Sequence, residues 1–306
     1  MHRLVHAVTL KIKHIRIGTT IANARGLNNS YMDKTMTPMK SWKTHLALAL
    51  PLLLASSVAS ATLIGQWTFE GTNVLADSQN NFGDLLLVGT ANVSNGQLDV
   101  NGAGTNPTGW ARTTGYTGGT ITDKTLVVWI SLQNFSNVAT AGSAMTIDRI
   151  NTDLFDGIVY GENDANRWMA GSNSHHRTQT ANLGYTETTT NTLVQMAFTY
   201  DDLNNGSVLI SGYRDGVSIG SYTDNPVGSW FANDTEIIFG ARHLWGGAPG
   251  GLDALISEAR IYDTALSQTD IQGLTMGAPA AVPEPASLAL LGLGLSLLGF
   301  MRRSRN

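Results

Sequence analysis

The sequence predicts an all-β sandwich of antiparallel strands, and three observations lead to this prediction. Between about residues 62 and 277, short apolar or alternating runs recur at roughly 8–12-residue spacing, with turn residues between them. Thr, Asn, Gly and Ser replace Lys and Glu on the expected surface, a composition typical of strands and turns. Cysteine is absent, so the fold depends on an apolar core, which a segment of this length can supply.

Strands in the first half of this domain are joined by polar turns. The domain opens with a predicted strand at 63–70. Short strands follow at 85–88 and 97–100, and Ser94-Asn95-Gly96 forms a hairpin-type turn between them. The run 125–132 is apolar on both faces, which predicts a central strand. Further short strands are expected at 144–150, 157–160, 167–170 and 182–185.

The second half has a clearer pattern. Strands at 193–200, 207–214 and 217–222 are separated by Asp-, Asn- and Gly-rich turns, which predicts a meander. One helix is expected, because Ser267 and Asp270 form a capping box that starts a short helix through Leu274. Two further strands are predicted at 236–240 and 254–262.

The start of the chain contains an export signal. Residues 39–61 have a basic beginning, an apolar stretch and small residues up to Ala61, the pattern of a secretory signal peptide that forms a helix. Cleavage after Ala61 leaves Thr62 as the mature N-terminus. Residues 1–38 carry six Lys/Arg against one acid, Asp33. They are interpreted as a start codon assigned too early, with a genuine basic extension as the alternative.

The predicted mature domain, residues 62–277, is strongly acidic. It contains eight Lys/Arg and 21 Asp/Glu, a formal net charge of −13, whereas the whole chain has −4. Because such a surface repels phosphate backbones, nucleic acid is excluded as a partner. The basic residues lie mainly in the two end segments.

The end of the chain, residues 278–306, has three parts. Pro283-Glu284-Pro285 is followed by the uncharged run 286–301 and then by an arginine cluster. As a helix, the run reaches only about 24 Å, short of a bilayer core of about 30 Å. This pattern resembles the PEP-CTERM sorting signal. The resemblance implies a short transmembrane segment, cleavage near Pro283, Glu284 and Pro285 by an exosortase-type protease, and a final location at the cell envelope, cell surface or matrix.

The domain itself resembles the laminin-G-like branch of the concanavalin A-like lectin/glucanase superfamily. The resemblance spans nearly all of 63–274 and is most specific at the Asp215-Gly216 hairpin and the last strand. It implies an antiparallel jelly-roll sandwich with one short helix near its end, between an N-terminal signal helix and a C-terminal hydrophobic helix. In the family, an Asp-Glu pair is usual near the middle of the last strand. Here the pair is Ser257-Glu258, so only Glu258 is retained.

Catalysis by this domain is not predicted. Glycoside hydrolysis needs two carboxylates roughly 5–9.5 Å apart. The glucanase relatives carry them as Glu-x-Asp-x-Glu on one strand, and this motif is absent from the sequence. The nearest groups, Asp153-Leu154-Phe155-Asp156 and Glu162-Asn163-Asp164, are interpreted as solvated loops.

A calcium ion is the cofactor that the sequence allows. Asp77 and Asp253 stand where laminin-G-like domains often place calcium ligands, and hard cations bind carboxylate oxygens on loops. The alternative is structural: Asp77 forms an Asx-turn and Asp253 forms the turn that enters the last strand.

Aromatic residues in loops provide the candidate ligand site, because sugar rings stack on Trp and Tyr faces. The candidates are His243, Trp245 and Trp168, at strand ends or in glycine-rich loops. The alternative is that these aromatics fold back over the core.

These features together predict an exported surface or matrix-associated binding protein. The family resemblance, rather than any residue, suggests polysaccharide of the bacterium's own matrix as the ligand. Two alternatives stay open: a structural matrix protein without a defined ligand, and an unrecognised glycoside hydrolase.

Overall fold

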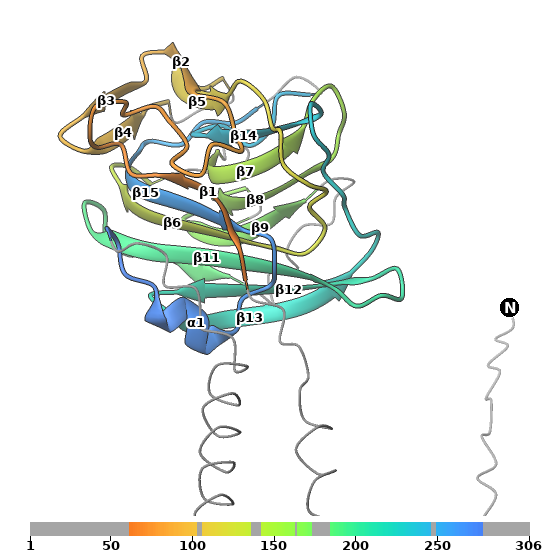
Figure 1. The fold of residues 1–306 in the computed structure, drawn as a ribbon. Helices are drawn as coiled ribbons and strands as arrows, with labels where there is room; N and C mark the ends of the chain where they lie inside the picture. Colours follow the sequence, from red (N-terminus) through yellow and green to blue (C-terminus); the bar gives the residue numbers. More distant parts are fainter. Residues whose placement is uncertain are drawn as a thin grey trace, which may run out of the picture. The chain divides into compact units, whose positions relative to one another are not determined.

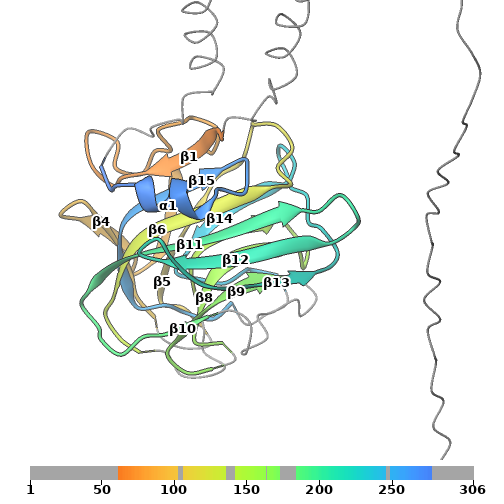
Figure 2. The ribbon, with the colours of Figure 1, turned by 90° about the horizontal axis from the view of Figure 1, so that it is seen from below.

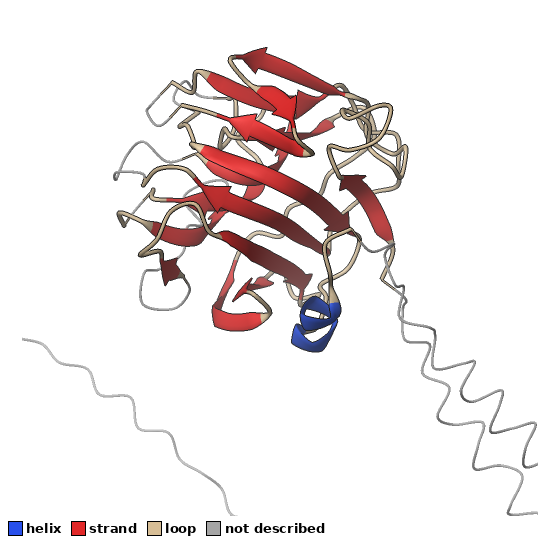
Figure 3. Ribbon diagram, turned by 90° about the vertical axis from the view of Figure 1, so that its left-hand side faces the viewer, coloured by secondary structure: helices blue, strands red, loops and turns tan. Residues whose placement is uncertain are grey.

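The computed structural model describes residues 61–102, 106–135, 142–162, 164–172, 184–245 and 249–277. These residues form two antiparallel β-sheets packed face to face, with one short helix (Figures 1 and 3). The predicted sandwich is therefore confirmed. The predicted signal peptide up to Ser60 and the predicted sorting signal lie outside the described residues. Within them, no helix has the length and apolar character needed to cross a membrane.

The first sheet has eight strands in the order β13-β12-β11-β6-β15-β4-β3, and β1 pairs with the other end of β15. The predicted central strand, β6 (Lys124–Leu132), is buried along its whole length and pairs with β11 and β15. The predicted meander is also confirmed, since β11, β12 and β13 are consecutive antiparallel neighbours. The other strands are β1 (Leu63–Trp67), β3 (Asn92–Ser94), β4 (Gln97–Val100), β11 (Leu193–Asp202), β12 (Val208–Arg214), β13 (Val217–Asp224) and β15 (Ala254–Tyr262).

The second sheet has seven strands in the order β10-β9-β8-β7-β14-β5-β2. Its strands are β2 (Leu85–Gly89), β5 (Gly109–Thr113), β7 (Ser143–Arg149), β8 (Phe155–Tyr160), β9 (Arg167–Ser172), β10 (Tyr185–Thr186) and β14 (Thr235–Phe239).

The main core fills the space between the two sheets. Alternate residues of each strand point inward, so Ile147 on β7 and Ile237 on β14 pack with Val128 on β6 and Phe198 on β11. The residues between them in sequence point to the outer faces. This alternation decides which polar side chains are available on the surface.

A second, smaller cluster lies on the outer face of the eight-stranded sheet. Helix α1 (Gln268–Gly273) lies against this sheet (Figure 2). Its buried Ile271 packs with Val127, Trp129 and Ala197. The predicted capping box of Ser267 and Asp270 is present. The helix therefore closes part of this face and leaves the part toward β4 open.

Two strands were not predicted, and one predicted pairing is wrong. β3 and β5 lie in segments for which the sequence predicted no strand. The turn at Asn95-Gly96 joins β3 to β4, whereas β2 pairs with β5 in the other sheet. The reason is that β5, Gly-Trp-Ala-Arg-Thr, contains residues of low strand propensity and is stabilised by its neighbours β2 and β14.

Candidate functional site

The outer face of the seven-stranded sheet carries a row of side chains contributed by three neighbouring strands. The register pairs Glu236 of β14 with Asp148 of β7, and Asp148 with Phe155 of β8. Since Ile237 and Ile147 point into the core, Glu236 and Asp148 point outward. Side chains directly opposite each other have Cβ atoms about 4.5–5.5 Å apart. The sheet thus brings two carboxylates together on one surface.

Both carboxylates are buried, which changes their acidity. Asp148 is 2% exposed and Glu236 is 4% exposed. Burial, and then the charge of Glu236, raises the pKa of Asp148 to about 8, although the N–H groups of Leu244 and Arg149 act in the other direction. Burial also raises the pKa of Glu236, while Arg112, 3.6 Å away, acts to lower it. A pKa of about 8 favours the protonated form of Asp148 at neutral pH.

One oxygen of this pair has no hydrogen-bond partner. Asp148 Oδ1 is buried and accepts or donates no hydrogen bond within the described part of the chain. Buried polar atoms are paired in most proteins, so an unpaired one needs an explanation. A ligand hydroxyl or a water molecule would provide the missing partner.

The loop that follows β14 packs on the same face. His243 is buried and stacks on Phe155, with ring centroids 4.6 Å apart and an interplanar angle of 6°. Its Nε2 lies 3.9 Å from Asp153 Oδ1, and an ion pair between Arg242 and Glu162 holds the start of the loop. Trp245 is 51% exposed. Of the two loop residues predicted to contact a ligand, Trp245 presents its side chain to solvent, and His243 fixes the loop.

The interpretation of Trp168 as a ligand contact needs correction. Trp168 is fully buried in the main core, 4.7 Å from the ring of Tyr160, and its Nε1 donates to Glu187 Oε1 at 3.0 Å. The reason is the pleat of β9, which turns Trp168 inward even though it stands beside the strand's end. Its ring is not available to a ligand.

The two predicted calcium ligands lie apart. Asp77 is 2% exposed, and its two oxygens accept four backbone N–H groups, from Gln66, Gln79, Asn81 and Phe82. This geometry matches the Asx-turn alternative.

Asp253 stands at the other end of the last strand. It precedes Ala254 at the start of β15, whereas Asp77 bonds to Gln66, which pairs with Arg260. At about 3.3 Å per residue, roughly 20 Å of strand separates them. Burial, and then Asp99, raises the pKa of Asp253. Among the described residues, no group of three or more His, Cys, Asp or Glu could hold a metal ion.

Glu258, the residue retained from the family's Asp-Glu pair, is fully engaged. A β-bulge between Ile256 and Glu258 turns both Ser257 and Glu258 toward the outer face of the eight-stranded sheet. Glu258 Oε1 accepts from Gln66 Nε2 at 2.7 Å and Arg260 Nε at 2.6 Å. Its Oε2 accepts from the N–H of Gly277 at 2.7 Å. This carboxylate therefore fastens the end of the domain to the sheet.

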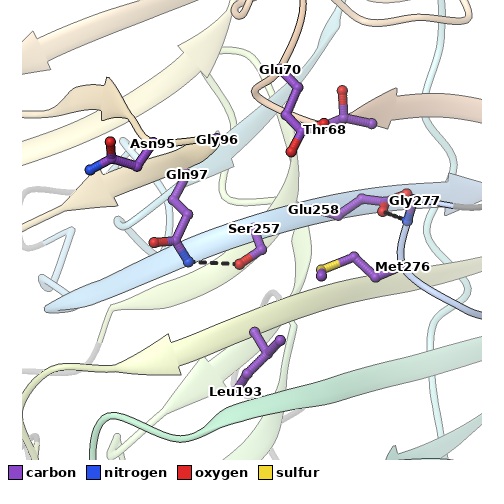
Figure 4. Close-up of a pocket in the computed structure, with 10 residues that line it drawn as sticks. All are labelled: Thr68, Glu70, Asn95, Gly96, Gln97, Leu193, Ser257, Glu258, Met276 and Gly277. Atoms are coloured by element: carbon purple, nitrogen blue, oxygen red, sulfur yellow. Dashed lines mark hydrogen bonds between the residues drawn. The ribbon is translucent and has the colours of Figure 1, made fainter.

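A pocket of about 420 Å³ lies beside Glu258 on this outer face (Figure 4). Gln97 Nε2 donates to Ser257 Oγ at 2.8 Å across its floor. The turn Asn95-Gly96 forms one wall, and the exposed side chains of Leu193 and Met276 lie at its other side. The remaining lining residues are Thr68, Glu70, Glu258 and Gly277.

The sequence could not reveal the Asp148–Glu236 pair, because only the register of β7 and β14 brings these residues together. The pocket could not be predicted for a similar reason, since its residues come from five separate segments of the chain. The sequence predicts the turn at Asn95-Gly96, but it does not indicate that this turn lines a pocket. His175 and His176, which the sequence predicts as solvated loop residues, lie outside the described residues.

A comparison with protein families now assigns the domain. The family model described as the concanavalin A-like lectin/glucanases superfamily matches residues 105–272. The chain belongs to this superfamily. A second model, for the PEP-CTERM protein-sorting motif, matches residues 281–306. The chain is therefore an exported protein that is sorted to the envelope or cell surface, and the motif implies processing by an exosortase.

Solved structures with the same concanavalin A-like fold include carbohydrate-active enzymes. Domain 4 of AbnA, a GH43 extracellular arabinanase from Geobacillus stearothermophilus in complex with arabinotriose, is 19% identical with a TM-score of 0.53. The match covers 70% of this chain and 98% of that domain. Trypanosoma rangeli sialidase, in complex with 2,3-difluorosialic acid, is 16% identical with a TM-score of 0.50, and the match covers 70% of this chain and 32% of the sialidase. At these identities the likeness shows the fold alone. No curated protein matches the sequence.

Proposed function

We propose that the chain is an exported polysaccharide-binding protein and that the surface around Trp245 is its binding site. The observation that carries this proposal is the half-exposed Trp245 beside the rigid stack of His243 on Phe155. A sugar ring can stack on an exposed aromatic ring, which supplies contact area at a small cost in conformational entropy. Because the Arg242–Glu162 ion pair and the stack fix the loop, little ordering is needed on binding.

Polar groups on the same face supply hydrogen bonds to sugar hydroxyls. Arg112 is 40% exposed and Asp153 is 64% exposed, so both can contact a ligand on the surface. The domain's net charge of −13 disfavours anionic polymers, so a neutral polysaccharide of the cell's own matrix is the proposed ligand.

The comparisons support this proposal only by analogy. The arabinanase domain was solved with arabinotriose, and it is covered almost completely by the match. Its identity to this chain is too low to transfer a ligand or a binding residue.

A glycan array tests the proposal with the full chain, in the presence of calcium and with calcium removed. The expected result is binding to neutral glycans by the wild type, clearly weaker binding in Trp245→Ala, and unchanged binding in the control Tyr185→Ala. Tyr185 is a matched choice because it is 38% exposed and lies on the edge strand β10. Binding to no glycan in either condition would favour the structural matrix protein instead. A requirement for calcium would support the predicted cofactor.

A glycoside hydrolase is the second candidate, and the Asp148–Glu236 pair favours it. Retaining glycosidases place two carboxyl groups about 5–5.5 Å apart. The register of β7 and β14 makes Asp148 and Glu236 direct cross-strand neighbours, whose Cβ atoms lie about 4.5–5.5 Å apart. The two carboxyl groups have different environments and would therefore have different roles. Asp148, with its raised pKa, would protonate the leaving oxygen. Glu236, beside Arg112, would attack the anomeric carbon. A water molecule, losing a proton to the Asp148 carboxylate, would then attack the anomeric carbon, break its bond to Glu236 and release the sugar.

Release of reducing ends from the bound glycan tests this second candidate. The expected result for a hydrolase is activity in the wild type that falls by at least about 100-fold in Glu236→Gln. An inactive wild type that binds the same glycan would leave the binding protein as the function.

A further inference from the structure

The pocket on the outer face of the eight-stranded sheet is built for a polar, uncharged ligand. None of its ten lining residues is basic, and Glu70 is an exposed acid at its edge. Anionic ligands are therefore disfavoured. Its volume of about 420 Å³ lies within the range of roughly 300–1,000 Å³ that is usual for small-molecule sites.

The hydrogen bond on the floor of this pocket leaves a donor and an acceptor for a ligand. Because Gln97 Nε2 donates to Ser257 Oγ, the Ser257 hydroxyl hydrogen can donate elsewhere, and Gln97 Oε1 can accept (Figure 4). Sugar hydroxyls both donate and accept. Glu258 contributes shape only, since its oxygens already accept from Gln66, Arg260 and Gly277.

The pocket walls are fixed by backbone geometry. Asn95 and Gly96 both have positive φ, 53° and 72°, as a tight hairpin turn requires. A Cβ atom at Gly96 would lie 3.0 Å from Glu70 Oε1, so glycine leaves room for that carboxylate at the pocket edge. The bulge in β15 turns Ser257 into the pocket.

This pocket and the Trp245 surface lie on opposite faces of the sandwich. Gln97 and Ser257 point away from the core on one sheet, and Glu236 and Asp148 point away from it on the other. Packed sheets are about 10 Å apart, and both sites lie outside them. A rigid domain holds two such sites on different sides, so a single short oligosaccharide cannot occupy both.

We propose that the pocket is a second site for neutral sugar units and that the domain is bivalent, cross-linking two polysaccharide chains. This inference rests on the proposed function of the Trp245 surface. A bivalent module in a matrix gains avidity and joins polymers without any additional contact. Export to the cell surface places the domain where such polymers occur.

The test uses the full chain and the neutral polysaccharide fraction of the exporting cells' matrix, whole and cut by mild acid to short oligosaccharides. Calorimetry with the oligosaccharides should give two sites per wild-type chain. Light scattering with the whole polymer should rise on mixing, because cross-linked polymer scatters more. Gln97→Ala and Glu70→Gln should each remove or weaken one site and reduce the scattering at least fivefold. Ser221→Ala, an exposed residue on edge strand β13, is the control and should change neither measurement.

Each outcome separates this inference from the proposed function. One site in the wild type that is lost in Trp245→Ala would overturn bivalency and keep the proposed function. One site that is lost in Gln97→Ala but not in Trp245→Ala would overturn bivalency and the Trp245 surface together. Two sites without a rise in scattering would overturn the cross-linking. Unfolding curves of every variant show whether a lost site reflects a lost fold, and Glu70→Gln alters only an exposed side chain.

Discussion

Asp148 and Glu236 illustrate how one residue pair can set a property of the whole surface. Ionising two buried, neighbouring carboxyl groups is energetically unfavourable, so the more buried Asp148 favours its protonated form. The result is a carboxylic acid that can donate a hydrogen bond at neutral pH. The residues next to Asp148 and Glu236 in the sequence do not indicate a raised pKa, because each carboxylate has its partner on another strand.

The raised pKa of Asp148, about 8 against an ordinary 3.8, predicts how stability depends on pH. The folded state retains a proton that the unfolded chain loses, so this stabilisation is complete below about pH 4 and falls as pH rises to about 8. The slope is at most about 1.4 kcal/mol per pH unit.

Urea unfolding of the wild type and of Asp148→Asn between pH 4 and 9 measures this effect. The variant should lose the slope that Asp148 contributes and should be the more stable protein at pH 8. Equal slopes in the two proteins would show that Asp148 titrates normally.

Lys124 and Asp156 form a buried ion pair that lies between the sheets. Lys124 Nζ is 2.9 Å from Asp156 Oδ2 and 3.9 Å from the ring centroid of Trp230. Burial lowers the pKa of Lys124, and Asp156 opposes that change. The interpretation of Asp156 as a solvated loop residue is wrong, because β8 begins at Phe155 and carries Asp156 into the core.

Replacing Lys124 by Met should lower the free energy of unfolding by about 3–5 kcal/mol, because Asp156 stays buried without its lysine. Urea denaturation at pH 7 measures the loss. The double variant Lys124→Met/Asp156→Leu should recover most of it. A single-variant loss below about 1 kcal/mol would mean that the pair is not coupled as described.

At the scale of elements, strand β15 organises the domain. It pairs with β6 on one side and with β1 and β4 on the other, and its bulge turns Ser257 and Glu258 outward. Glu258 binds the N–H of Gly277, and Arg260 binds the carbonyl of Thr275 at 2.9 Å. The strand therefore holds the segment after α1 against the sheet.

Glu258→Ala should release this segment and cost about 3–5 kcal/mol, since Arg260 remains buried without that carboxylate. Limited proteolysis followed by mass analysis should show cleavage between residues 274 and 277 that is faster than in the wild type. Glu258→Gln keeps the shape and is expected to lose less. Unchanged cleavage in Glu258→Ala would contradict the proposal that Glu258 holds the segment after α1 against the sheet.

Strong local signals were sufficient for most elements. The apolar run of β6, the turns of the β11–β13 meander and the capping box at Ser267 each indicate their structure without help from distant residues. β5 gave no such signal. Its Gly109 and Ala111 favour a strand only when β2 and β14 lie on both sides.

At the scale of the whole molecule, the candidate site was only partly visible in the sequence. The sequence indicates Trp245 as a ligand contact because it is an aromatic residue in a glycine-rich loop, and its side chain is exposed. Trp168 satisfied a similar rule but is buried, because a residue's facing depends on strand pairing. The acid pair and the pocket depend on register and on a bulge, which composition and spacing do not encode.

The two end segments predict how the mature chain is processed. Mass analysis of protein isolated from the cell surface should show an N-terminus at Thr62, following cleavage after Ala61, and a C-terminus near Pro283, Glu284 and Pro285. A chain found there with residues 39–61 intact would contradict the predicted signal peptide.

Retardation of the full chain in native gels that contain the neutral matrix polysaccharide tests the central claim most directly. The account predicts that the polymer slows the wild type and Tyr185→Ala equally, increasingly with its concentration, and that the same polymer concentration slows Trp245→Ala clearly less. Equal mobility of the wild type with and without polymer would contradict it.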